Sequence, residues 1–203
     1  MKFDVLTLFP EMFEPVKQSI LGRALEKKLI DINLINIRDF SKDKHKKVDD
    51  TPYGGGAGMV IRPDVVYDAY QSIQDKQAKV IYMSPQGKTL NQKTVEELSK
   101  ESHLIILCGH YEGIDQRVLD KIVDEEISIG DYVLTGGGIP AMVLIDSVSR
   151  YIEGVIKKDS ICEESFSNRS SRISTIYKTW NIWRRKNTRN INIWTSSKYW
   201  KMA

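Results

Sequence analysis

The sequence predicts an α/β domain with a mainly parallel sheet and helices on both faces. Along residues 1–168, short apolar segments alternate with segments whose apolar residues recur at helical spacing, which is typical of β-α units. Glycine-containing turns follow several of the apolar segments, as expected where strands end. The chain is 41% hydrophobic and 28% charged, which is the composition of an ordinary globular protein.

The first half of the chain is expected to open with a strand, a helix and a second strand. Residues 2–9 form an apolar run that ends at Pro10, and residues 31–37 alternate, so both predict strands. Between them, apolar side chains recur every three or four residues over 12–29, which predicts one long helix. The stretch 41–58 is polar and basic and then rich in glycine, which predicts a long exposed loop.

The remaining elements continue the alternation. The expected helices are 63–74, 92–99, 118–123 and 140–151, and the expected strands are 79–83, 104–108, 126–129 and 131–134. Three of these strands end near glycine-containing loops at 84–87, 109–113 and 130–138. Because ligands bind beyond the carboxyl ends of parallel strands, the three loops predict a binding site.

Several classes of protein are excluded by composition. No apolar run approaches the ~20 residues that a membrane span requires, and the start lacks the pattern of a secretory signal. We therefore expect no membrane partner and a cytoplasmic location. The two cysteines, Cys108 and Cys162, cannot form a disulfide framework, and no CxxC or Cys/His cluster offers a zinc site. No metal-ligating residue is predicted.

Two glycine-rich motifs are each open to two interpretations. Residues 54–58 (GGGAG) could cradle a phosphate or form a surface loop, but no Gly-Lys-Ser/Thr follows, so they are not a P-loop. Gly136, Gly138 and Ala141 fit the dinucleotide pattern GxGxx(G/A), and this match alone supports an oxidoreductase hypothesis. Since no second strand follows the helix, we regard that match as weak.

Charged and titratable side chains beside the predicted loops can likewise be explained by a structural role instead of a functional one. Glu112 and Asp115 place two carboxylates after a strand, where catalysis or helix capping by Asp115 would explain them. The lysine-rich stretch 42–47 could meet a polyanion or only be solvated. His45 and His110 are too isolated in the sequence to indicate metal ligation.

Longer blocks of the sequence resemble the bacterial tRNA (guanine-N1)-methyltransferase family. They are LTLFPEMF at 6–13, RDF at 38–40, VDDTPYGGGAGMV at 48–60, YMSPQGKTL at 82–90, LCGHYEGIDQRV at 107–118, DEEISIGDYVLTGGGIPAMVLIDSVSRYIEGV at 124–155, and EESFSN at 163–168. The resemblance implies methyl transfer from S-adenosylmethionine to N1 of the guanosine 3′ of the anticodon, position 37 of tRNA. It also implies a homodimer, contact with the tRNA anticodon arm, and a deep C-terminal trefoil knot of the SPOUT type.

The same resemblance implies which residues hold S-adenosylmethionine. By motif, the cofactor contacts are Tyr82, Ser84, Pro85, Gly109, Tyr111, Glu112, Gly113, Ile129, Gly130, Asp131, Tyr132, Val133, Leu134, Gly136, Gly137 and Gly138. Glycines allow the backbone to approach adenine and ribose closely, and an apolar wall would shield the sulfonium. Mg²⁺ is a further candidate ion, without assigned ligands.

The implied chemistry needs two further groups. N1 of guanine carries a proton, so methylation requires a general base and a donor for the charge that grows on O6. The resemblance assigns Glu164 as the base and Arg150 as the donor. Many relatives carry Asp at the base position, and the extra methylene of Glu would shift the carboxylate by about an ångström. Without the resemblance, a solvated loop carboxylate would be the preferred interpretation of Glu164.

Residues 169–203 differ in chemistry from residues 1–168, which we predict to be the knotted cofactor-binding and catalytic domain. They contain nine Lys or Arg and all four Trp of the chain, but no Asp, Glu, Gly, Pro or Leu. We predict an irregular, basic and aromatic tail in place of the start of the family's helical tRNA-binding domain. We interpret it as a frame-shifted segment, because synonymous codons read one base later restore GLLEYPQYI after EESFSN. A genuine nucleic-acid-binding arm is the alternative.

Two functional hypotheses follow in addition to the weak oxidoreductase one. The first is a tRNA (guanine-N1)-methyltransferase. The second is a module that binds the cofactor and RNA without turnover, because the C-terminal part of the family pattern is lost from the sequence after Asn168.

Overall fold

The computed structural model describes residues 1–75, 77–157, 181–182 and 185–186. Contacts divide the chain into two units, Met1–Ile161 and Cys162–Ala203. In the second unit, β8 (Asn181–Ile182) and β9 (Arg185–Lys186) pair in antiparallel fashion. The rest of the predicted tail 169–203 lies outside the described residues.

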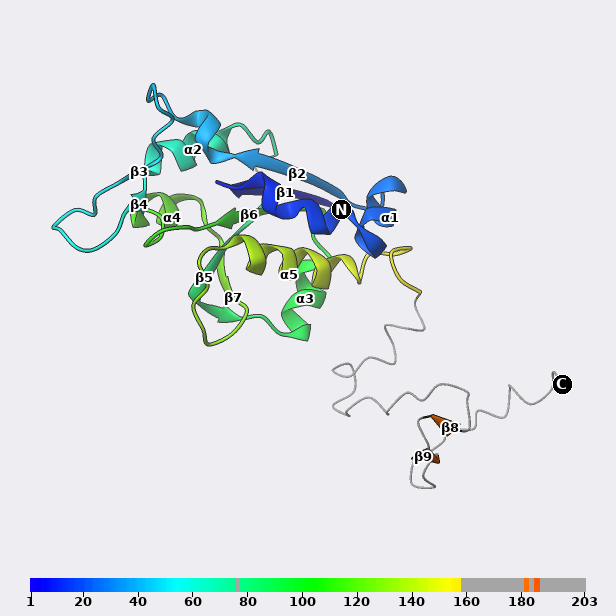
Figure 1. Cartoon of the computed structure of the whole chain (residues 1–203). Coiled ribbons are helices and arrows are strands. Elements are labelled where there is room, and N and C mark those ends of the chain that lie inside the picture. Colours follow the sequence, from blue (N-terminus) through cyan, green and yellow to red (C-terminus); the bar gives the residue numbers. More distant parts are fainter. Residues whose placement is uncertain (76, 158–180, 183–184, 187–203) are drawn as a thin grey trace. The chain divides into compact units, whose positions relative to one another are not determined.

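Five parallel strands form the sheet of the first unit, in the order β2-β1-β6-β5-β7 (Figure 1). They are β1 (Lys2–Thr7), β2 (Asp31–Asn36), β5 (Lys79–Thr89), β6 (His103–Cys108) and β7 (Glu125–Ser128). The central strand β6 is buried along its whole length, as expected for a parallel strand that is covered on both faces. The predicted parallel α/β sheet is confirmed.

Alternate residues of the strands face two separate apolar cores, one on each side of the sheet. Leu104 and Ile106 belong to one core, whereas Ile105 and Leu107 belong to the other. The first core is covered by η1 (Pro10–Lys17), α1 (Ser19–Glu26), α3 (Gln92–Leu98) and α5 (Gly138–Ser149). The second is covered by η2 (Ile37–Phe40), α2 (Pro63–Gln71) and α4 (Gln116–Ile122). Each fully buried Leu or Ile stabilises such a core by roughly 1.5–3 kcal/mol.

Two predicted elements are wrong. The helix expected over 12–29 is divided into η1 and α1 at Gln18, whose backbone is extended (φ −113°, ψ 169°). η1 contains Pro15, which cannot donate the backbone hydrogen bond of a helix interior. The strand expected over 131–134 is a loop that begins at Gly130, whose φ of +153° is in the region that favours glycine.

Strand β5 is longer than the predicted 79–83 because it bulges rather than ends. Met83 and Lys88 both pair with Ile127 of β7, so the residues between them leave the ladder. The predicted loop 84–87 is therefore a bulge within a strand, held at both ends by β7.

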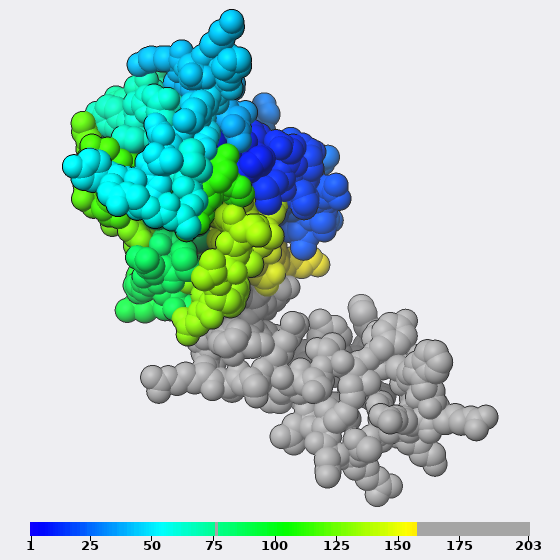
Figure 2. Space-filling model, turned by 60° about the vertical axis from the view of Figure 1, so that its left-hand side comes forward, coloured from blue at the N-terminus to red at the C-terminus, as the bar shows by residue number. Residues whose placement is uncertain are grey.

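Most of the segment 41–58 is exposed as predicted, although Val48 is buried in the second core, and it forms the cyan surface turned to the viewer in Figure 2. Within this segment, β3 (Asp49–Asp50) pairs in antiparallel fashion with β4 (Val60–Ile61), which follows it. Tyr53 is fully exposed near the tip of the segment. Within the described residues, no helix is both long and apolar enough to cross a membrane.

Candidate functional site

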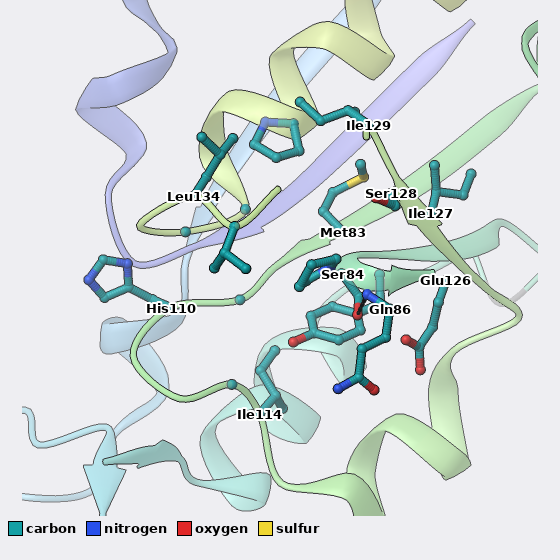
Figure 3. Close-up of a pocket in the computed structure, with 18 of the residues that line it drawn as sticks. Met83, Ser84, Gln86, His110, Ile114, Glu126, Ile127, Ser128, Ile129 and Leu134 are labelled. Atoms are coloured by element: carbon teal, nitrogen blue, oxygen red, sulfur yellow. Dashed lines mark hydrogen bonds between the residues drawn. The ribbon is translucent and has the colours of Figure 1, made fainter. Parts of the chain in front are cut away.

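The three loops predicted at strand ends surround one cavity of about 320 Å³ (Figure 3). Its walls come from the bulge 84–87, the loop 109–113 after β6, and the segment 129–137 between β7 and α5. The volume falls within the roughly 300–1,000 Å³ that is typical of small-molecule sites. The structure therefore brings the three predicted loops together at the carboxyl ends of parallel strands.

Direct backbone contacts join two of these loops. The N–H of Gly137 donates to the carbonyl oxygen of Gly109 at 2.8 Å, and His110 forms a β-bridge with Gly136. A Cβ atom on Gly137 would lie 2.8 Å from the Cα of Cys108 and 2.9 Å from the backbone nitrogen of Gly109. Because backbone atoms cannot give way cheaply, only glycine fits at position 137.

Tyr82 forms the buried floor of the cavity beneath Gly109. A Cβ on Gly109 would lie 2.8 Å from the Tyr82 hydroxyl oxygen, so the ring packs directly against the loop. Burial raises the pKa of Tyr82 to about 12, with smaller contributions from the charges of Glu126 and Cys108. The Tyr82 phenol therefore stays neutral at physiological pH.

The loop after β6 continues into the helix cap at Asp115. The Asp115 side chain accepts a hydrogen bond from the backbone N–H of Arg117 at 3.0 Å, and the Arg117 guanidinium binds the same carboxylate at 2.9 and 2.6 Å. These hydrogen bonds hold the pKa of Asp115 below its usual range. The capping interpretation of Asp115 is confirmed.

Glu112, in contrast, lines the cavity and joins it to the glycine-rich loop. Its backbone N–H donates to the carbonyl oxygen of Met59 at 3.0 Å. The Glu112 side chain also packs against Gly58, whose φ is +80°, and a Cβ at position 58 would overlap with it. Tyr111 before it has φ of +58°, a strained value for a residue with a side chain, of the kind found at functional sites.

Most of the predicted cofactor residues line this cavity. Those that do are Tyr82, Ser84, Pro85, Gly109, Tyr111, Glu112, Gly113, Ile129, Gly130, Tyr132, Val133, Leu134, Gly136 and Gly137. Asp131 is exposed and outside the lining, and Gly138 begins α5, buried near Met12.

Neither of the two predicted catalytic residues is found in the described cavity lining. Arg150 caps the carboxyl end of α5, is half-buried, and is not part of the cavity lining. Glu164 lies outside the described residues. The structure therefore leaves both assigned roles as predictions.

Sequence reasoning missed several residues of the lining. They are Met83, Gln86, His110, Ile114, Gln116, Leu119, Glu126, Ile127, Ser128, Thr135 and Pro140. Gln86 and His110 lie inside the predicted loops, so the loop boundaries could have identified them. No sequence signal pointed to Glu126. It differs from its neighbour Glu125 only through the register of β7 against β5, which pairs Glu126 with Tyr82.

The lining also bears on the other candidate ligands. Among the described residues, no Lys or Arg lines the cavity, so a pyrophosphate there would meet no cationic side chain. This argues against the dinucleotide interpretation of Gly136, Gly138 and Ala141. No group of three or more His, Cys, Asp or Glu that could hold a metal ion occurs in the described part of the chain.

Comparison with known proteins agrees with the blocks quoted above. Residues 1–186 match the family described as tRNA (Guanine-1)-methyltransferase TrmD, a match that extends beyond the last block at Asn168. The tRNA (guanine-N(1)-)-methyltransferase of Ruminiclostridium cellulolyticum is 62% identical over 173 residues, covering 83% of this chain and 74% of the relative. That of Caldicellulosiruptor saccharolyticus is 61% identical over 169 residues (82% and 69%), and that of Clostridioides difficile 52% over 174 residues (83% and 75%). The chain therefore belongs to the tRNA (guanine-1)-methyltransferase family.

Proposed function

We propose that the chain transfers a methyl group from S-adenosylmethionine to N1 of the guanosine 3′ of the anticodon, position 37 of tRNA. Membership of the family gives the reaction, methylation of tRNA guanine at N1. The observation that carries the cofactor site is that the three motif-bearing loops line one and the same cavity. We further propose that residues 1–168 are the cofactor-binding and catalytic domain and that the protein acts in the cytoplasm.

The cavity suits S-adenosylmethionine in shape and in charge. Glycine backbone at positions 109, 113, 136 and 137 lets main-chain groups reach a nucleoside without intervening side chains. Apolar side chains of Ile129, Leu134 and Pro140 offer a wall for an adenine ring. The charged side chains of the described lining are carboxylates, which complement a sulfonium.

When bound, S-adenosylmethionine supplies an electrophilic methyl group. For this chain, we propose that Glu164 accepts the proton from N1 of guanine as the N1–methyl bond forms. The Arg150 guanidinium would donate to O6, where negative charge develops. The loops around Gly109 and Gly137 would fix the donor so that N1 attacks in line with the bond that breaks.

A homodimer is part of the proposal, and the surface of α5 supports it. Ile139 and Val143 are spaced by one helical turn and are 45% and 42% exposed. Met12 and Ile20, on the neighbouring η1 and α1, are also exposed apolar residues. A second copy of the chain would remove this apolar surface from water.

The trefoil knot of the family is a further part of the proposal. Its support is the direct contact between the loop after β6 and the segment before α5, where Gly137 lies against the backbone of Cys108 and Gly109. Direct backbone contact of this kind is expected where one segment is threaded past another.

The test combines binding with a single turnover. We expect isothermal titration calorimetry to show saturable binding of S-adenosylmethionine and no binding of nicotinamide dinucleotides. Excess protein should then methylate a tRNA transcript at N1 of its position-37 guanosine, measured by mass spectrometry of the digested RNA. Parallel reactions with Mg²⁺ or EDTA decide whether the ion is required. Cofactor binding without methylation would instead establish the non-catalytic module, and failure to bind the cofactor would refute both.

A further inference from the structure

Two carboxylates face the cavity without a cation beside them. Glu112 and Glu126 are part of the lining, and no Lys or Arg among the described residues joins them. Figure 3 shows Glu126 with Gln86 at one end of the cavity and His110 with Leu134 at the opposite end. The backbone of Gly87 packs against the backbone of Glu126, which keeps the bulge and the carboxylate together.

Glu126 differs from its neighbour in the same strand. The Glu125 carboxylate pairs with the Lys79 ammonium at 2.7 Å and approaches that of Lys88 at 4.0 Å. Glu126 is half-buried and makes no ion pair with any residue that the structure describes. Consecutive strand residues point to opposite faces of the sheet. The Glu125 carboxylate therefore meets lysines on one face, whereas Glu126 lines the cavity on the other.

An unpaired carboxylate in a partly desolvated cavity is costly unless something compensates its charge. The register of the sheet places Glu126 beside Tyr82, at the cavity floor. The neutral Tyr82 phenol supplies no compensating charge, and the described lining contains no Lys or Arg. A cationic ligand in the cavity would supply the compensating charge.

We propose that Glu126 makes the cavity select the positively charged methyl donor over its neutral, demethylated product. This inference rests on the proposed function. S-adenosylmethionine carries a sulfonium and an ammonium against one carboxylate, whereas S-adenosylhomocysteine has lost the sulfonium charge and is neutral overall. The negative charge of Glu126 attracts the sulfonium and so increases the affinity for the donor. Once the methyl group has left, the product lacks this attraction, which promotes its replacement by a new donor molecule.

The experiment compares three ligands with three forms of the folded protein. Calorimetry measures the affinities of S-adenosylmethionine, S-adenosylhomocysteine and sinefungin, which carries an amine in place of the sulfonium. The forms are the unmodified chain, Glu126→Gln, and the matched control Glu125→Gln, which changes the adjacent carboxylate outside the cavity. Thermal melting verifies that each form is folded, and Glu126→Asp provides a second variant that keeps the charge.

We expect Glu126→Gln to lower the affinity ratio of donor to product by roughly tenfold or more, and to weaken sinefungin similarly. Glu125→Gln and Glu126→Asp should keep the ratio close to that of the unmodified chain. Equal weakening of donor and product in Glu126→Gln, or an unmodified chain that does not prefer the donor, overturns the inference and leaves the proposed function intact. An unmodified chain that binds neither ligand overturns both.

Discussion

Gly137 shows how one hydrogen atom in place of a side chain can decide whether a cavity forms. A methyl group added to its Cα would press on the backbone of Cys108 and Gly109. We therefore expect Gly137→Ala to separate the two loops and to weaken S-adenosylmethionine binding by about tenfold or more, measured by calorimetry. The control Gly54→Ala adds a methyl group that meets no atom within 4 Å but strains the backbone, whose φ there is +86°, so it measures the effect of local strain away from the cavity lining. Unchanged affinity in Gly137→Ala would show that the loop contact is dispensable.

The assignment of Glu164 as general base makes a different prediction. Glu164→Gln keeps the size of the side chain and removes its ability to accept a proton. We expect near-parental affinity for the cofactor and a single-turnover methylation rate about 10²–10⁴-fold lower. A variant that methylates tRNA at the parental rate would mean that another group takes the proton.

Which residues could be predicted depended on how local their signal is. The glycine-bearing loops at 84–87, 109–113 and 130–138 could be located because glycine and strand ends are visible in the sequence itself. Glu126 could not, because its orientation depends on pairing with Tyr82, over 40 positions earlier in the chain. The positive φ of Tyr111 was equally invisible, since tertiary contacts impose it on a residue that does not favour it.

At the scale of elements, α5 carries the prediction about assembly. Val143 is 42% exposed on the same helical face as Ile139. If this face is the dimer contact, Val143→Asp places a charge in an apolar interface and should yield monomers in analytical ultracentrifugation. The control Lys93→Asp alters an exposed position on α3 and should leave the dimer unchanged. A dimeric Val143→Asp protein would locate the interface elsewhere.

The start of β6 makes the protein sensitive to acid. His103 is buried there and lies 2.9 Å from both the Asp4 and the Asp75 carboxylate oxygens. The hydrogen bond with His103, followed by that from the backbone N–H of Gln77, lowers the pKa of Asp75 from its usual 3.8. A lowered folded-state pKa stabilises the fold above the unfolded value, and this stability is lost as pH falls through the folded value.

The corresponding test is a series of melting temperatures at decreasing pH. Between about pH 5 and pH 3, the melting temperature of the unmodified chain should fall more steeply than that of Asp75→Asn, which has no carboxylate to protonate. Because Asp75 is 46% exposed, solvent screening keeps the difference small. Parallel curves would exclude a contribution from this carboxylate.

Elements with simple periodicity were predictable, and those shaped by the cavity were not. The strand 104–108 and the helix 92–99 were located within one residue of β6 and α3. The segment 131–134 alternates like a strand, but its Val133 is 81% exposed, because these residues wrap a ligand cavity instead of joining a sheet. Periodicity measures which side chains avoid water, and it cannot tell whether protein or ligand covers them.

At the scale of the whole molecule, the position of Arg150 needs an explanation, because it lies at the far end of α5 and not in the cavity lining. Helix α5 has 12 residues, and a helix of that length extends about 18 Å between the loop at Gly137 and Arg150. If the protein is a dimer, we expect Arg150 of one protomer to complete the cavity of its partner. Within one chain, the cavity and this side chain would then serve two different sites.

Mixed dimers test this arrangement. Arg150→Ala retains the cavity and Gly137→Ala retains the arginine, so each protein alone should methylate tRNA much more slowly when S-adenosylmethionine is held near the parental dissociation constant. After subunit exchange, each heterodimer holds one complete site, and the mixture should recover about a quarter of the parental methylation rate. No recovery would place Arg150 and the cavity of the same protomer together.

The order of the strands also has a consequence for synthesis of the chain. Strand β1 can pair with β2 early, but its other edge waits for β6, which begins 67 residues after Asn36 ends β2. At the roughly 5–20 residues per second of bacterial or eukaryotic ribosomes, this wait lasts about 3 to 13 s. During that time the edge of β1 that will pair with β6 has no partner, and it can pair with another nascent chain instead. Strand β1 is thus the segment most open to mispairing during synthesis, and dependence on chaperones should be greatest before Cys108 leaves the ribosome.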